Sequence, residues 1–125
     1  MLNRTFAMLA VVACAALPLA AQAPGSAKEG SETEITGQVI DVNCFTTGVA
    51  GSAHKQCAQA CAKAGVTLAI LGSDGNIYIP VSSKGGDAQN SRLIAFAEAT
   101  VKVKGIHRFA NGLHTIEIKT VAAAT

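Results

Sequence analysis

The chain has 125 residues, of which 50% are hydrophobic and 14% charged, and its formal net charge is only +2. This composition allows one small domain with a modest core, and it excludes a protein that binds nucleic acid through a broad cationic surface. The chain has no tryptophan, one tyrosine and four phenylalanines, so a surface of stacking aromatic side chains is also disfavoured. We therefore expect no nucleic-acid partner.

The N-terminal segment predicts where the protein works. A short polar start precedes an apolar run from Phe6 to Leu19, and small residues follow it. This is the pattern of a secretory signal peptide over residues 1–23, and Pro18 leaves the run too short for a membrane-spanning helix. Cleavage after Ala23 or after Ala21 would fit. We expect a periplasmic or secreted protein with no transmembrane segment once the signal is removed.

Cys14 offers a competing interpretation of the same segment. Val11-Val12-Ala13-Cys14 is similar to the lipobox of bacterial lipoproteins, in which the cysteine is lipidated and becomes the mature N-terminus. The apolar run continues past Cys14, unlike the run before a lipoprotein tether. A cleaved signal peptide is therefore favoured over a lipid anchor, and in both cases Cys14 lies outside the folded domain.

The stretch after the signal separates a leader from a folded domain. Residues 24–34, "PGSAKEGSETE", are small and polar and predict a flexible leader, which leaves residues 35–125 for the domain. The first strand is expected from Ile35 to Cys44. Its apolar pattern changes phase near Val39 and Ile40, and a β-bulge or a sharp coil of the strand at this point would reconcile the two halves.

Two helices and a hairpin are expected next along the chain. "SAHKQCAQACAKAG" predicts a helix with Ser52 as N-cap and Gly65 at its end. "VTLAILGSDGNIYIPV" predicts a hairpin whose turn is Gly72-Ser73-Asp74-Gly75. "NSRLIAFAEAT" is rich in helix-forming residues, with Asn90 or Ser91 as its cap.

The last predicted element is a hairpin in "VKVKGIHRFANGLHTIEI". Asn111-Gly112 is the strongest short turn signal for two paired strands. This turn places Phe109 opposite His114 and His107 opposite Ile116, so both histidines fall on the apolar face. The histidine pair is a secondary candidate metal site, and histidines bonded to backbone carbonyls are the competing interpretation.

These elements together predict a mainly β (α+β) fold with the order β-α-β-β-α-β-β. The stretches "TGQVIDVNC", "DGNIYIPV" and "VKVKGIHRFANGLHTIEI" resemble those of small exported bacterial OB-fold-like β-barrel domains. The resemblance implies a small OB-like barrel over residues 35–125. The helix after the first strand departs from the five-stranded pattern, and it carries cysteines and a histidine. The resemblance implies no activity, because one fold hosts many functions.

Three of the four cysteines gather around that helix. At helical spacing His54, Cys57 and Cys61 share one face with small alanines, which we expect to pack on the sheet. A glycine-containing loop could return Cys44 to the same place. Three thiolates and an imidazole suit Cu(I) or Zn(II), and "CAQAC" with a nearby histidine is similar to the site of thioredoxin-fold copper chaperones. Asp41 is expected as a second-shell group, and a solvated or turn-capping carboxylate is the competing interpretation.

The sequence leaves other uses of the cysteines open. In an oxidising compartment Cys44 could bond to Cys57 or Cys61 and staple the helix to the barrel, with one thiol left over. A bond between Cys57 and Cys61 is disfavoured, because Cβ atoms one helical turn apart are about 5–6 Å from each other, against roughly 3.5–4.5 Å in a disulfide. A thiol redox protein is a third hypothesis.

The predicted function follows from the site, since the chain shows none of the common catalytic motifs. We expect an exported carrier or sensor of Cu(I) or Zn(II), bound by Cys44, His54, Cys57 and Cys61, with a metal-donor or metal-acceptor protein as partner. The alternative is a disulfide-stapled OB-like interaction module without metal or catalysis.

Overall fold

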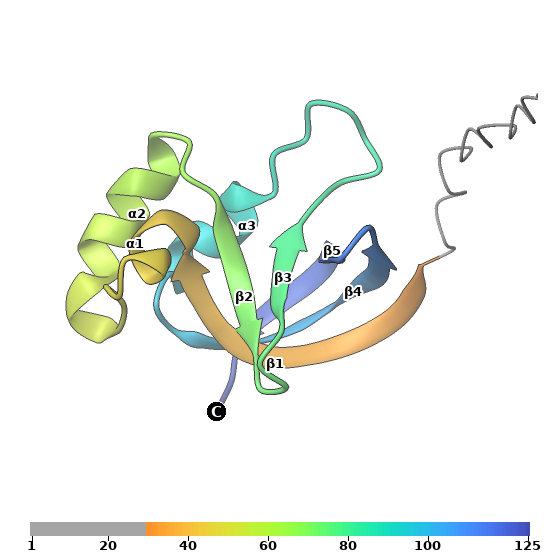
Figure 1. Cartoon of the computed structure of the whole chain (residues 1–125), viewed down its shortest axis with the longest axis horizontal. Coiled ribbons are helices and arrows are strands. Elements are labelled where there is room, and N and C mark those ends of the chain that lie inside the picture. The colour runs from red at the N-terminus through yellow and green to blue at the C-terminus, as the bar shows by residue number, and fades with distance from the viewer. Residues whose placement is uncertain (1–29) are drawn as a thin grey trace, which may run out of the picture.

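The computed structural model describes residues 30–125, so the predicted signal peptide, the lipobox around Cys14 and residues 24–29 of the leader lie outside the described residues. The described chain is mainly β, as predicted. Five strands form one mixed sheet that closes into a ring in the order β1-β2-β3-β5-β4 (Figure 1). The strands are β1 (Ser31–Asp41), β2 (Leu68–Gly72), β3 (Ile77–Pro80), β4 (Thr100–Ala110) and β5 (Leu113–Ala123). Neighbouring strands are antiparallel except β3 and β5, which run parallel.

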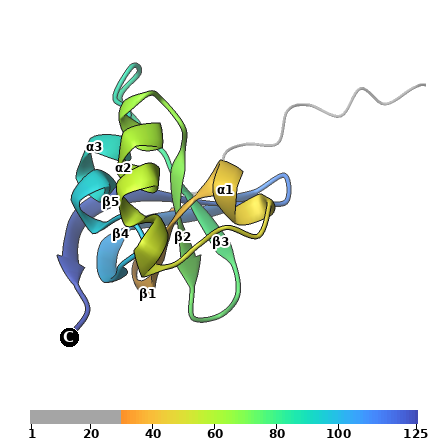
Figure 2. The same ribbon diagram turned by 90° about the vertical axis from the view of Figure 1, so that its left-hand side faces the viewer.

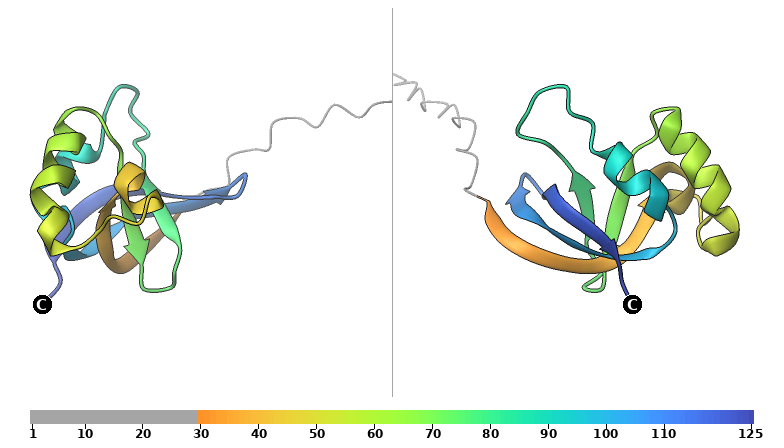
Figure 3. Two further views of the ribbon diagram at one scale, coloured as in Figure 1. Left: turned by 60° about the vertical axis from the view of Figure 1, so that its left-hand side comes forward. Right: turned by 180° about the vertical axis from the view of Figure 1, so that it is seen from behind.

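The helical pieces lie between the strands. Between β1 and β2 the chain forms α1 (Val42–Thr46), the 3₁₀ helix η1 (Ser52–His54) and α2 (Lys55–Lys63). Between β3 and β4 it forms α3 (Asn90–Leu93) and the 3₁₀ helix η2 (Ile94–Phe96). The predicted order β-α-β-β-α-β-β is confirmed, with α1 as an additional element. The helices gather at one side of the ring, and the β4–β5 turn and the start of β1 lie at the opposite side (Figures 1 and 3).

The first strand differs from its prediction at both ends. It begins at Ser31, inside the predicted leader, because residues 31–38 pair with β4. It ends at Asp41, where the chain turns into α1. Cys44 therefore lies on a short helix and not at the end of the strand.

The phase change in β1 arises from burial on both faces. The register with β2 runs without a break from Gly37 opposite Gly72 to Asp41 opposite Leu68, so the predicted bulge at Val39-Ile40 is wrong. Val39 faces the core, and Ile40 on the other face is also fully buried. A strand covered on both sides loses the polar and apolar alternation from which register is deduced.

The core fills the inside of the ring. Alternate apolar residues of the strands meet there, and α2 and α3 close one end of it with Ala62 and Leu93. The strand residues of this cluster are Ile35, Val39, Leu68, Ile70, Tyr78, Val101, Val103, Ile116 and Ile118. No helix among residues 30–125 is long and apolar enough to cross a membrane.

Gly37 lies where β1 passes from β4 to β2. It is paired with Val101 on one side and with Gly72 on the other, and a Cβ atom there would overlap the backbone carbonyl of Leu71. We expect Gly37→Ala to destabilise the domain by about 1–3 kcal/mol, as overpacking does. Chemical unfolding measures this loss. Gly85→Ala is the control, because a Cβ there meets nothing within 4 Å, and equal stabilities of the two variants would contradict the close approach.

Candidate metal centre

The turn after β1 positions Cys44. Asp41 ends the strand in an extended conformation, and its Oδ1 accepts a hydrogen bond of 3.0 Å from the backbone N–H of Cys44. This is the N-cap interaction that starts a helix. The prediction that Asp41 caps a turn is confirmed. The cap places Cys44 in α1, which lies at the same side of the ring as α2 (Figure 2).

The three described cysteines form one cluster, which we call the thiol triad. Cys44 and Cys61 are half-buried and Cys57 is exposed, and all three are free thiols. After burial, the other cysteines contribute to the raised pKa values of Cys44 and Cys61, so the three thiols are neighbours. The structure thus brings together the three cysteines that the sequence predicts as ligands.

Burial and neighbouring charges raise the pKa values of two of these thiols, Cys44 and Cys61. Burial raises the pKa of Cys61 to about 11, and hydrogen bonding to Cys57 and the charges of Cys57, Asp41 and Cys44 act in the same direction. Burial also raises the pKa of Cys44, followed by the charge of Asp41. Reactive cysteines have lowered pKa values, so neither thiol is prepared as a nucleophile. An ion that binds here must displace protons, because the thiolate is the ligand.

Asp41 has a second, unused oxygen. The residue is fully buried, and its Oδ2 atom has no hydrogen-bond partner in the structure. Its charge acts on both Cys44 and Cys61. A buried carboxylate oxygen without a partner is costly, so this group is unexplained by the packing alone.

His54 has a partner outside the triad. Its Nδ1 lies 3.0 Å from Oε1 of Glu98, and both side chains are buried. The other oxygen of Glu98 accepts hydrogen bonds from Nε2 of Gln38 at 3.0 Å and from the backbone N–H of Gly51 at 2.7 Å. Nε2 of His54 is buried without a partner.

Glu98 is the residue at this site that our sequence analysis missed. It is a buried acid at φ 61°, a left-handed conformation that is uncommon for a residue other than glycine. The signal that could have found it is a single acid in the apolar stretch "LIAFAEATV".

The packed face of α2 is not the predicted one. Its buried residues are Ala58 and Ala62, which follow His54 at helical spacing, whereas Cys57 and Ala60 are exposed. The element starts as the 3₁₀ helix η1, and Gln59 donates a hydrogen bond of 3.0 Å to the carbonyl of Ile94. The face of α2 that packs on the rest of the domain is therefore centred near Ala58 and Ala62 and not on Cys57. Cys57 and Cys61 lie beside this packed face.

The triad is not closed around an ion in this geometry. Among residues 30–125, no group of three or more His, Cys, Asp or Glu side chains is arranged to hold a metal ion. Of the four predicted ligands, the structure groups the three cysteines and bonds His54 to Glu98. His54 as a ligand stays a prediction.

The second histidine site lies on the β4–β5 hairpin, across the ring from the helices. The predicted register is confirmed, with Phe109 opposite His114 and His107 opposite Ile116. Nε2 of His107 lies 3.0 Å from Nδ1 of His114, and the stacked rings meet the edge of Tyr78. The two imidazoles thus bond to each other and not to a backbone carbonyl. Their use as a metal site stays a prediction.

The histidine pair should make stability depend on pH. Burial lowers the pKa of His107, the charge of His114 lowers it further, and the charge of Asp74 opposes both. The folded chain therefore binds this proton less readily than the unfolded chain, and the stabilisation is present above the ordinary pKa of about 6.5 and is lost as pH falls below it. We expect His107→Gln to flatten the fall in unfolding free energy between about pH 7 and pH 5. Identical pH profiles for both proteins would contradict this.

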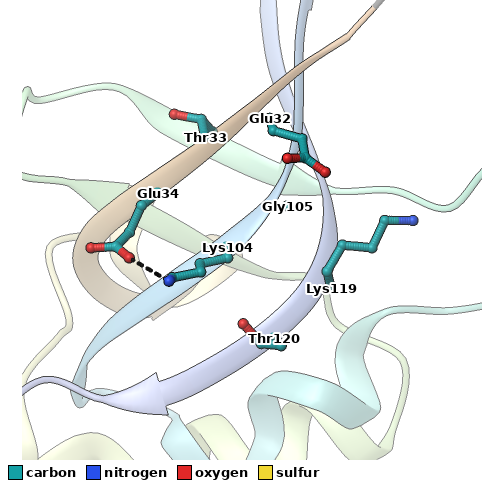
Figure 4. Close-up of a pocket in the computed structure, with 7 residues that line it drawn as sticks. All are labelled: Glu32, Thr33, Glu34, Lys104, Gly105, Lys119 and Thr120. Carbon is teal, nitrogen blue, oxygen red and sulfur yellow. Dashed lines mark ion pairs between the residues drawn. The ribbon is translucent and has the colours of Figure 1, made fainter.

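A shallow hollow of about 440 Å³ lies apart from both sites (Figure 4). It is lined by Glu32, Thr33, Glu34, Lys104, Gly105, Lys119 and Thr120. Glu34 pairs with Lys104 at 3.4 Å and with Lys102 at 3.6 Å. Exposed ion pairs of this kind contribute about 0–1 kcal/mol to the stability of the fold. The charged side chains that line the hollow are thus explained as pairs between neighbouring strands.

The fold and the triad define a small mainly β domain that holds three neighbouring cysteines on α1 and α2. A scan against models of known protein families found no match, and searches of the curated proteins and of the solved structures found none either.

Proposed function

We propose that this protein is an exported OB-like domain that binds a soft metal ion, Cu(I) or Zn(II), through Cys44, Cys57 and Cys61. The observation that carries the proposal is the thiol triad, in which three cysteines from the neighbouring helices α1 and α2 lie close enough to influence one another. Thiolates are the ligands that soft and borderline ions prefer. Carriage or sensing of the ion, with exchange to a metal-donor or metal-acceptor protein, is the corresponding use.

Two further features support the setting of this site. The strand order, with β3 parallel to β5 in a five-stranded closed ring, is compatible with an OB-like barrel. The signal-like sequence of residues 1–23 supports export. Cysteines in an oxidising compartment usually pair, and a bound metal ion would keep these three thiols reduced.

Binding requires the three sulfur atoms to move together. A Zn–S bond is about 2.3 Å long, so the thiolates must close around the ion. Cys57 is exposed on α2 and can change its rotamer with little steric hindrance, whereas Cys44 and Cys61 are half-buried. Uptake also releases protons from thiols of raised pKa, so affinity should increase with pH.

A count of free thiols tests the proposal. Protein exported into its own compartment is alkylated after denaturation, with chelator present and reductant absent. Alkylation of Cys44, Cys57 and Cys61 together, with about one Cu(I) or Zn(II) per chain before chelation, is the expected result. A single alkylated cysteine would reveal a disulfide and overturn the proposal.

A disulfide-stapled interaction module is the second candidate, and it is supported by the closeness of Cys44 on α1 to the two cysteines of α2, both of which influence its pKa after burial. A bond from α1 to α2 would close a loop of moderate length and contribute on the order of 3 kcal/mol. The thiol redox hypothesis is less well supported, because the pKa values of Cys44 and Cys61 are raised and not lowered.

A further inference from the structure

We propose that Asp41 supplies a fourth ligand through its Oδ2 atom, and that this carboxylate makes the site selective for Zn(II) over Cu(I). This inference rests on the proposed function, since it assumes that the thiol triad binds a metal ion. The fourth ligand is then the N-cap residue of α1, the helix that carries Cys44, whereas the sequence predicts His54 as that ligand.

The position of Asp41 is fixed by the fold. It is the last residue of β1, opposite Leu68 of β2, and none of its surface is exposed. Its Oδ1 is held by the N–H of Cys44 at 3.0 Å. The carboxylate therefore cannot move away from the first turn of α1, and its free oxygen stays close to the helix that carries one ligand.

The free oxygen lacks what a buried carboxylate needs. Oδ2 of Asp41 is buried and unpartnered, and a single backbone hydrogen bond does not compensate for the burial of a charge. The carboxylate acts electrostatically on both Cys44 and Cys61, so it belongs to the surroundings of the triad. A bound cation would satisfy Oδ2 and would balance the negative charge of the thiolates.

The donor set distinguishes the two ions. Zn(II) is almost always four-coordinate in closed sites and accepts carboxylate oxygen together with sulfur, whereas Cu(I) is selected by soft sulfur ligands. Three thiolates and a carboxylate carry four negative charges, of which Zn(II) balances two and Cu(I) only one. The carboxylate therefore adds a ligand and a charge that benefit Zn(II) more.

His54 is less well placed for this position. Its Nδ1 is bonded to Glu98, which is itself held by Gln38 and Gly51. Glu98 lies 44 residues further along the chain, between η2 and β4, and holds the imidazole from that side. Asp41 is instead in direct contact with the backbone of a triad residue.

Asp41→Asn tests the inference, because asparagine has the same size and is an equally good N-cap but carries no charge. Reduced protein is titrated anaerobically with Zn(II) and, separately, with Cu(I) against competing chelators. We expect Asp41→Asn to lower Zn(II) affinity by about 10-fold or more and Cu(I) affinity by less than about 3-fold. His54→Ala, the comparison variant, should change Zn(II) affinity by less than about 3-fold.

The outcomes separate this inference from the proposed function. Unchanged Zn(II) affinity in Asp41→Asn, an equal loss for both ions, or a large loss in His54→Ala alone would each overturn the role of Asp41. Wild-type protein that binds neither ion would overturn the proposed function itself. Asp41→Ser, in which the serine hydroxyl can cap the helix in place of the carboxylate, repeats the test if Asp41→Asn does not fold. Far-UV circular dichroism checks the fold of each variant.

Discussion

Replacement of Glu98 by alanine should lower the unfolding free energy by about 3–5 kcal/mol, the cost of breaking a buried ionic or hydrogen-bonded group. The Glu98 side chain is 1% exposed and is the common partner of His54, Gln38 and the N–H of Gly51. Without the carboxylate these three groups lose their acceptor in a buried place. The chain has no tryptophan, so urea unfolding followed by far-UV circular dichroism is the suitable measurement.

Two further variants distinguish the contribution of the Glu98 carboxylate to stability from the strain of its backbone conformation. Glu98 has φ 61°, a conformation that glycine adopts without strain. Glu98→Gly should therefore be more stable than Glu98→Ala by about 1 kcal/mol, although both lose the hydrogen bonds. Glu98→Gln keeps the size and part of the hydrogen bonding, and it should lose least. A Glu98→Ala protein as stable as the wild type would show that the hydrogen bonds of this carboxylate do not stabilise the fold.

This carboxylate also connects the fold to the site. Gln38 belongs to β1 and Gly51 precedes η1. His54 is the last residue of η1 and the N-cap of α2, the helix that carries Cys57 and Cys61. Glu98 thus anchors the start of that helix to the sheet from a position just before β4.

Local signals explain what the sequence could predict. The β4–β5 register follows from Asn111-Gly112, both of which have positive φ, at 53° and 80°. A two-residue turn of this kind fixes the pairs next to it, up to the register shift between Lys104 and Gly105, and so the partners of His107 and His114 were predicted correctly. The grouping of Cys44 with Cys57 and Cys61 was also predictable, because a short loop joins their elements.

The missed features depend on distant parts of the chain. "VIDVNC" alternates like a strand, and only the burial of Asp41 and its bond to Cys44 show that a helix begins there. The packed face of α2 was missed because alanines lie on both of its faces, with Ala58 and Ala62 buried and Ala60 exposed, so small residues do not mark the packed side. The bond between His54 and Glu98 joins residues 44 positions apart, and no local pattern indicates it.

Serine in place of Cys61 should weaken metal binding by more than the roughly 10–100-fold that loss of an outer-shell partner costs, because a thiolate that binds the ion directly would be removed. The same loss is expected for Cys44→Ser and Cys57→Ser. Ala60→Ser is the matched control, since it adds a hydroxyl to the exposed side of the same helix. Anaerobic titration of the reduced proteins with Zn(II) and Cu(I) measures all four variants.

The pattern across the three cysteines decides between a metal site and a disulfide staple. A metal held by three thiolates needs all three cysteines, so each single variant should lose affinity while the stability of the oxidised and reduced proteins stays similar. A disulfide needs only two. In that case two variants should lower stability by about 3 kcal/mol in the oxidised protein alone, and the third should have no effect. Because a bond between Cys57 and Cys61, one helical turn apart, is disfavoured, Cys44 must belong to the sensitive pair. An oxidised Cys44→Ser protein of unchanged stability would therefore exclude the staple.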